Sequence, residues 1–163
     1  MPLDHEWIEQ HIPHKGRMCL LDEVLAWDAK RIRCRSATHR VSDNPLRAHG
    51  RLGAACGIEY AAQAMAVHGA LMAASAPLAS TMSRSIRGSL GSRVGYLAAV
   101  RNVTFYVARL DDLDTDLIAA AERVTGDARS VLYEFSVWGA QRPLLEGRAT
   151  VVIDAAFGAG GTP

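Results

Sequence analysis

The sequence contains few cysteines, and they form no recognisable pattern. Cys19, Cys34 and Cys56 are the only three in 163 residues, and no two of them make a CxxC pair. An odd number of unpatterned cysteines argues against both a disulfide framework and a zinc site. The histidines near the N-terminus also lack the spacing of a metal-ligand set. We therefore expect no metal, no resident cofactor and a reducing, cytoplasmic setting.

An excess of charge of either sign is also missing. The chain has 18 lysines and arginines against 17 acidic residues, a formal net charge of +1. Such a balance does not predict a nucleic-acid surface, so a charged partner would need a local patch. No basic start followed by an apolar run is present, so we expect no signal peptide. The most apolar window, residues 54–79, is interrupted by Glu59, Gln63, His68 and Pro77 and predicts a buried helix rather than a membrane span.

The remaining pattern predicts one domain over residues 1–163. In its N-terminal segment, residues 1–17, Asp4 is expected to cap a short helix that Pro13 ends. Strands are expected at 18–28, 31–41, 96–108, 117–125, 130–138 and 144–154, and a long helix at 54–74. A loop should occupy 42–53, a mobile segment or lid 75–95, and a frayed tail 155–163.

This order of elements predicts the fold class. Consecutive strands after the long helix favour an α+β fold with an antiparallel sheet over an alternating β-α-β fold. One helix covers only one face of a sheet, so the sheet should curl around it. Such a sheet still has an edge that a second copy could extend.

Glu59 is the residue that most needs an explanation. Its neighbours in the helix are small and apolar, among them Ile58 and Ala62. An ionised carboxylate in such surroundings is costly unless it is paired or hydrogen-bonded. Glu59 is therefore either a satisfied buried glutamate or a functional group. Gln63 lies on the same helix face as Glu59. It either orients Glu59 or binds backbone across a dimer, and we prefer the second interpretation. His68 lies half a rotation away and is interpreted as a core or interface histidine.

Four stretches together resemble a known family. They are IPHKGRMCLLDEV, IEYAAQAMA, GYLAAVRNVTFYVARLDDLDTDL and PLLEGRATVVI, in that order between Ile12 and Ile153. The chain resembles the hotdog-fold 3-hydroxyacyl-acyl-carrier-protein dehydratases, which implies a hotdog fold. Its short loop NPLRAHGRLGAACG is more similar to the dehydratase-like proteins of aryl-polyene and other specialised acyl-chain pathways. Those usually have Asp-Gly or a similar pair where this chain has His49-Gly50.

The resemblance implies a reaction and a catalytic pair. The reaction is dehydration of 3-hydroxyacyl thioesters to enoyl thioesters, with Glu59 and His49 contributed by different subunits of a dimer. Desolvation would keep part of Glu59 protonated as the general acid, and His49 would be the base. The backbone amides of Cys56 and Gly57 would face the thioester carbonyl, and Gly57 would permit close approach. The implied role of His14 is structural, holding the N-terminal segment on the helix.

The resemblance also implies partners. The substrate would be attached to the phosphopantetheine of an acyl carrier protein, and Arg84, Arg87 and Arg93 would dock its phosphate or the acidic carrier. A solvated polar loop is the alternative for these arginines. The chain would work as a homodimer or as a heterodimer with a related hotdog subunit. Two other functions stay open: a non-catalytic partner subunit that binds acyl chains, and a hotdog thioesterase.

Overall fold

A computed structural model describes residues 1–76 and 94–154. Helix α1 (His5–His11), the 3-10 turn η1 (Gly16–Met18), strands β1 (Glu23–Trp27) and β2 (Arg31–Ser36) and the turn η2 (Thr38–Arg40) come first. The turn η3 (Ala54–Cys56) leads into the long helix α2 (Gly57–Ser75). Strands β3 (Val94–Phe105), β4 (Leu117–Gly126), β5 (Ser130–Gly139) and β6 (Arg142–Asp154) follow. The predicted order of elements is confirmed for the described residues.

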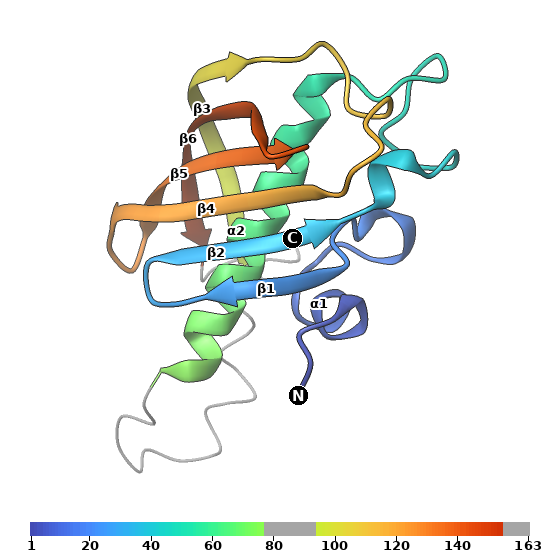
Figure 1. Ribbon diagram of the computed structural model, residues 1–163. Helices are drawn as coiled ribbons and strands as arrows, with labels where there is room; N and C mark the ends of the chain where they lie inside the picture. The colour runs from blue at the N-terminus through green and yellow to red at the C-terminus, as the bar shows by residue number, and fades with distance from the viewer. Residues whose placement is uncertain (77–93, 155–163) are drawn as a thin grey trace, which may run out of the picture.

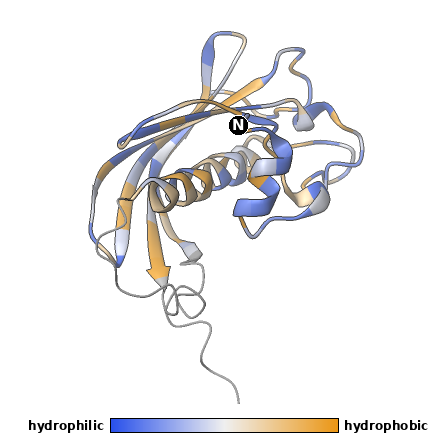
Figure 2. Cartoon of the chain, turned by 90° about the horizontal axis from the view of Figure 1, so that it is seen from below, coloured by the Kyte–Doolittle hydropathy of each residue, from blue (hydrophilic) through white to orange (hydrophobic). Residues whose placement is uncertain are grey.

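The six strands form one antiparallel sheet in the order β1-β2-β4-β5-β6-β3. The sheet curls around α2, which crosses its concave face (Figures 1 and 2). This confirms the predicted α+β hotdog arrangement. Strands β4, β5 and β6 follow one another as a meander, whereas β3 pairs with β6 and lies at the edge of the sheet.

The core lies between α2 and the concave face of the sheet. Strand β5 shows this most clearly, because its alternate residues Val131, Tyr133, Phe135 and Val137 are buried, as the sequence predicted. Helix α2 contributes the following buried residues to the same core: Tyr60, Ala61, Ala64, Met65, Val67, His68 and Leu71. Two of these helix residues, Ala61 and Ala64, are small, so the sheet can pack close to the helix backbone there.

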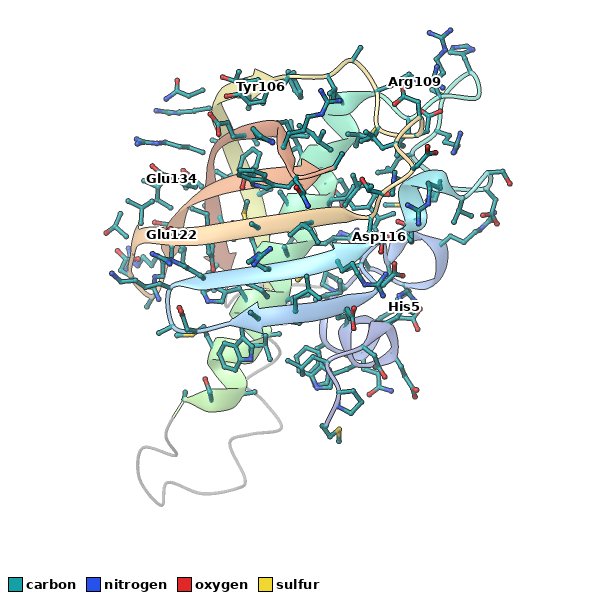
Figure 3. The ribbon with its side chains drawn as sticks, viewed as in Figure 1. His5, Tyr106, Arg109, Asp116, Glu122 and Glu134 are labelled. Atoms are coloured by element: carbon teal, nitrogen blue, oxygen red, sulfur yellow. The ribbon has the colours of Figure 1, made fainter. Side chains whose placement is uncertain are left out.

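Several charged side chains lie on the convex face of the sheet, among them Glu122 and Glu134 (Figure 3). On β2 the arginines alternate with buried residues, which confirms the predicted arginine-rich outer face. Glu122 and Glu134 lie directly opposite each other on β4 and β5. Each has an arginine beside it: Arg31 lies 3.3 Å from Glu122, and Arg148 lies 2.9 Å from Glu134. These pairs offset the repulsion between two carboxylates at facing positions.

The N-terminal segment agrees with the sequence in its cap and differs in its first strand. Asp4 caps α1, because its carboxylate accepts the Trp7 backbone N–H at 3.0 Å. The strand expected from residue 18 begins only at Glu23, so that prediction is wrong for residues 18–22. The strand expected at 31–41 ends at Ser36 and a 3-10 turn follows, so that prediction is wrong for residues 37–41. Residues 19–21 are buried there, and the Leu20 N–H is bonded to the Gln63 side chain instead of a neighbouring strand.

Candidate active site

Glu59 lies in the first turn of α2, on a side of the helix that the sheet does not cover completely. Its side chain is 31% exposed, so it is neither in open solvent nor fully enclosed by this chain. Gly57 and Tyr60, its neighbours on the core side, are buried. The carboxylate therefore sits at a boundary between the apolar core and the surface that a second molecule could cover.

His14 is the side chain that the fold brings to this carboxylate. It lies between α1 and β1, and its Nε2 is 2.9 Å from Glu59 Oε1. Its Nδ1 is buried and has no hydrogen-bond partner among the described residues. Nε2 is therefore the ring nitrogen that donates to the carboxylate. The predicted tethering role of His14 fits this contact, but its partnership with Glu59 was not foreseen.

Gln63, one turn further along the same face of α2, also binds the Glu59 carboxylate. Its side chain is fully buried, and its Nε2 donates to Glu59 Oε1 at 3.0 Å and to the Met18 carbonyl at 2.7 Å. Its Oε1 accepts the Leu20 N–H at 2.8 Å. Because one amide oxygen and one amide nitrogen each have a matching partner, the side chain has only one satisfactory orientation. Gln63 therefore orients Glu59, and the backbone that it binds is that of its own chain, whereas our preferred interpretation was backbone across a dimer.

The pKa of Glu59 reflects two opposing effects. Burial alone would raise it, but the hydrogen bonds from His14 and Gln63, together with the charge of His14, lower the pKa below its ordinary value. The expectation that desolvation keeps part of Glu59 protonated is therefore wrong for this chain. Two donors aimed at the same oxygen outweigh a partial loss of water, so Glu59 is ionised near neutral pH.

His49 lies elsewhere, at the tip of a tight turn. Ala48 and Arg51 exchange two backbone hydrogen bonds of 2.9 and 3.0 Å, and the two residues between them have positive φ angles, 53° at His49 and 72° at Gly50. This is the geometry of a two-residue turn for which Asn-Gly or Asp-Gly is the preferred pair. The His49 side chain is exposed, and the chain does not bring it to its own Glu59. Its catalytic role across a dimer remains a prediction.

The residues expected to bind the thioester are largely engaged within the chain. The Cys56 N–H donates to the Gly53 carbonyl at 3.0 Å, and the Gly57 N–H donates to carbonyls of the same turn. Packing disfavours a larger residue than Gly57, because a Cβ there would lie 2.5 Å from Cδ2 of the buried Leu145 side chain, which would have to shift. Burial raises the pKa of the Cys56 thiol, which opposes formation of a thiolate. Arg84, Arg87 and Arg93 lie outside the described residues, as does most of the expected lid at 75–95. Its described ends belong to regular elements, because α2 ends at Ser75 and β3 begins at Val94.

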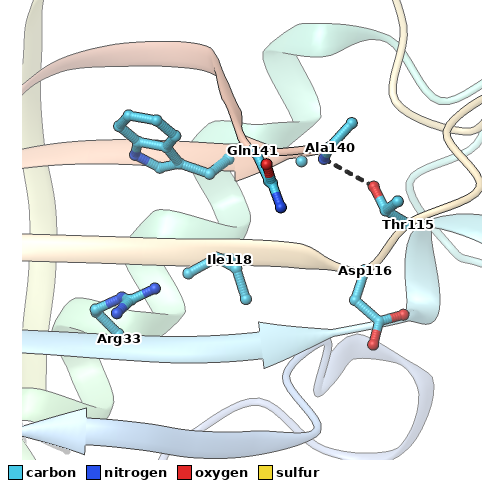
Figure 4. A pocket seen from close by; sticks show the side chains of 8 residues that line it. Arg33, Thr115, Asp116, Ile118, Ala140 and Gln141 are labelled. Carbon is cyan, nitrogen blue, oxygen red and sulfur yellow. Dashed lines mark hydrogen bonds between the residues drawn. The ribbon is translucent and has the colours of Figure 1, made fainter.

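Other features of the described residues do not add to this site. One hollow of about 300 Å³ lies on the convex face, between Arg33, Trp138 and the Ala140–Gln141 turn (Figure 4). A second, of similar size, is lined by Arg109, Asp112 and Arg142 among others. In residues 1–76 and 94–154, no three histidine, cysteine or acidic side chains are placed to hold a metal ion. Nor does that part of the chain contain a helix with the length and apolarity to cross a membrane.

Comparison with known proteins identifies the family. The model of the family described as "ApeP-like: ApeP dehydratase" matches residues 6–157. The chain belongs to the ApeP-like dehydratase family. No curated protein sequence matches the chain.

Solved structures agree with the ApeP-like fold. The dehydratase heterocomplex ApeI:P from Xenorhabdus doucetiae matches with a TM-score of 0.71 and 19% identity, over 94% of this chain and 91% of that one. A mutant of the thioesterase PA1618 from Pseudomonas aeruginosa matches with a TM-score of 0.52 and 14% identity, over 80% and 79% of the two chains. A hypothetical thioesterase with coenzyme A from Streptococcus pneumoniae has a TM-score of 0.52 and 11% identity, over 81% and 84%. At these identities the likeness shows the hotdog fold, and the family match shows a dehydratase family.

The sequence of this ApeP-like chain signals the two central residues of the candidate site with different strength. Glu59 stands out by its apolar neighbours alone. His14 gave a weaker signal: it belongs to the Ile-Pro-His opening that carries the family resemblance, yet it is 45 residues from Glu59. Only the fold places the two together.

Proposed function

We propose that this chain catalyses the dehydration of 3-hydroxyacyl thioesters, presented on the phosphopantetheine of an acyl carrier protein, to trans-2-enoyl thioesters. The observation that carries the proposal is the half-buried Glu59 carboxylate held by His14 and Gln63 in a chain of the ApeP-like dehydratase family. No resident cofactor is needed for this chemistry, because it consists of proton transfer and loss of water.

The proposed chemistry uses Glu59 as a single proton carrier. Its ionised carboxylate removes a proton from C2, and the electron pair of that C–H bond forms the C2–C3 double bond as the C3–O bond breaks. The same carboxyl group returns the proton to the departing hydroxyl, so water leaves and the carboxylate is restored. Both hydrogen bonds that Glu59 accepts from described residues end on Oε1. We therefore assign the proton transfer to Oε2.

The thioester carbonyl is proposed to lie beside the N-terminal end of α2, near Cys56 and Gly57. Negative charge builds on this oxygen when the C2 proton is removed, and the positive end of the helix dipole favours it. His14 keeps its hydrogen bond to Oε1 throughout, which holds the carboxylate ionised and aimed. In this scheme the lowered pKa of Glu59 is useful, because the base is in its active form at rest.

A related hotdog subunit is proposed as the partner that completes the site. The edge strand β3 exposes large apolar side chains, and Leu97 and Phe105 remain 40% and 45% exposed. Helix α2 is apolar on its outer side too, where Ile58, Ala62 and Ala66 are only partly buried. A helix that is apolar all round is usually buried on all sides in the working assembly. The similar structure from Xenorhabdus doucetiae is a heterocomplex, which supports a heterodimer over a homodimer.

The test offers a 3-hydroxyacyl thioester to the chain, alone and with a candidate hotdog partner, and measures enoyl product against free thiol. Replacing Glu59 with Gln should reduce enoyl formation by about 10²- to 10⁴-fold, the usual contribution of a general acid–base group. Replacing His14 with Ala should also reduce it, and His49→Ala tests the catalytic role across a dimer that the family resemblance implies. Undiminished enoyl formation by Glu59→Gln would refute the proposal.

The pH dependence separates the two possible roles of Glu59. As a base with a lowered pKa, Glu59 is active when ionised, so kcat/KM should be constant through neutral pH and fall only when the pH drops through that pKa. As a resting acid, it would lose activity as the pH rises through the same value and be nearly inactive at pH 7. A fall in kcat/KM with rising pH that is removed by Glu59→Gln would therefore contradict the base assignment.

A second candidate is a dehydratase-like partner subunit without a complete catalytic pair. The exposure of His49 favours it, because this chain does not bring the histidine expected from the resemblance to its own carboxylate. In that case the active complex should tolerate both Glu59→Gln and His14→Ala, and the partner's own residues should be essential. Free thiol as the main product would indicate a thioesterase, the third possibility.

A further inference from the structure

The segment from Ile12 to Leu20 forms a strap between α1 and α2, and His14 lies within it. The α2 end of the strap is held by Gln63, which bonds the backbone of Met18 and Leu20. Ile12 is buried, so the strap is also anchored just before His14. What fixes the strap just after His14 determines whether the imidazole can reach Glu59.

Two contacts at the end of α1 hold this second position. Glu9 Oε1 accepts the Gly16 N–H at 2.6 Å, a short charge-assisted hydrogen bond. The Lys15 ammonium folds back on the end of α1 and donates to the Ile12 carbonyl at 2.9 Å and to the Glu9 carbonyl. Gly16 has a positive φ angle of 58°, so the chain turns sharply at the residue whose N–H binds the Glu9 carboxylate.

From this geometry we infer that Glu9 is a positioning residue for His14. The Glu9 carboxylate binds Gly16, two positions after His14, and so holds it on α1. Ile12, two positions before His14, is held by its own burial in the core. The backbone of His14 is thus held on both sides, and its imidazole faces α2. Without the bond from Gly16 to Glu9, the strap is free to lift and the 2.9 Å contact between His14 and Glu59 lengthens.

The effect of losing Glu9 should be measurable as a change in the titration of Glu59, although Glu9 does not contact Glu59. The His14 hydrogen bond helps to hold the Glu59 carboxylate ionised. Loss of Glu9 should therefore move the titration of Glu59 in the same direction as loss of His14. A role of Glu9 limited to stabilising α1 would leave that titration unchanged. The inference rests on the proposed function only for its importance to catalysis, because the readout is a titration.

The experiment follows the Glu59 side-chain carboxyl by ¹³C NMR as the pH is lowered, with Glu59→Gln used to assign the resonance. We expect the midpoint to rise in His14→Ala, and to rise by at least half that amount in Glu9→Ala. Glu9→Gln keeps an acceptor for the Gly16 N–H and should stay near wild type. Glu9→Asp, which is one methylene too short to reach Gly16, should behave as Glu9→Ala if the latter does not fold.

Two controls make the result specific. Glu6 is an exposed glutamate in the first turn of the same helix, and Glu6→Ala should leave the Glu59 midpoint unchanged. In the His14→Ala background, Glu9→Ala should produce no further shift, because both changes act through one hydrogen bond. An unchanged Glu59 midpoint in folded Glu9→Ala or Glu9→Asp would overturn the inference, as would a full additional shift in the double variant. Neither result would contradict the proposed dehydration, because that proposal is tested separately by the activity measurements.

Discussion

Gly57 allows a stability prediction that follows directly from atomic distances. A Cβ on Gly57 would lie 2.5 Å from Cδ2 and 3.2 Å from Cδ1 of Leu145, a fully buried side chain of β6. Overpacking a filled core costs about 1–3 kcal/mol. Alanine gains at most about 1 kcal/mol of helix propensity, and less in the first turn. We therefore expect Gly57→Ala to lower the free energy of unfolding by about 1–2 kcal/mol, since the packing cost exceeds the gain.

Gly69 in the same helix is the matched control. It is exposed, and a Cβ there would meet no atom within 4 Å. Gly69→Ala should stabilise the isolated chain by about 0.5–1 kcal/mol, measured by urea unfolding. Leu145→Ala is itself destabilising, but adding Gly57→Ala to it should cost at least about 1 kcal/mol less than in the wild-type chain. Equal stabilisation by both glycine replacements would refute the packing argument and restore substrate approach as the reason for Gly57.

Two further predictions concern the β5–β6 turn and a buried histidine. Ala140 and Gln141 both have positive φ angles, 50° and 61°, so replacing them with Asn and Gly should stabilise the fold by about 1–2 kcal/mol; an unchanged melting temperature would contradict this. His68 is buried between Tyr133 and the Asp28 carbonyl, at 2.9 and 2.8 Å, and burial lowers its pKa. The unfolded chain therefore binds the proton more readily, and the free energy of unfolding should fall as the pH drops from about 7 to 5. His68→Gln should flatten that slope, and an equal slope in both proteins would show that another group is responsible.

The fold could be predicted because it depends on local patterns. The alternation in β5 and the apolar density around Ala61 reflect burial on one strand face and around one helix, and both are visible without a partner segment. His68 was also interpreted correctly as a core residue, since its position on the helix follows from the helical repeat alone. The first strand was predicted too long because Leu20 is buried by a side-chain contact with Gln63, which no local pattern encodes.

The site was harder to predict for a different reason. The sequence singled out Glu59 because a carboxylate among apolar residues is locally unusual. Its partner could not be chosen from several histidines, since His14 reaches it only through the fold of the strap. The direction of the Glu59 pKa could not be derived either. Burial and hydrogen bonding have opposite effects, and their balance depends on two donor positions, at 2.9 and 3.0 Å, that only the structure gives.

This balance also bears on why the carboxylate has two donors. In the isolated chain Glu59 is 31% exposed, and water contributes to keeping it ionised. A second subunit packed against the outer side of α2 would remove that water and push the pKa of Glu59 upwards. The hydrogen bonds from His14 and Gln63 do not depend on solvent, and they become stronger as the surroundings become less polar. The pair of donors is therefore the feature that would oppose protonation of Glu59 if a second subunit covered it.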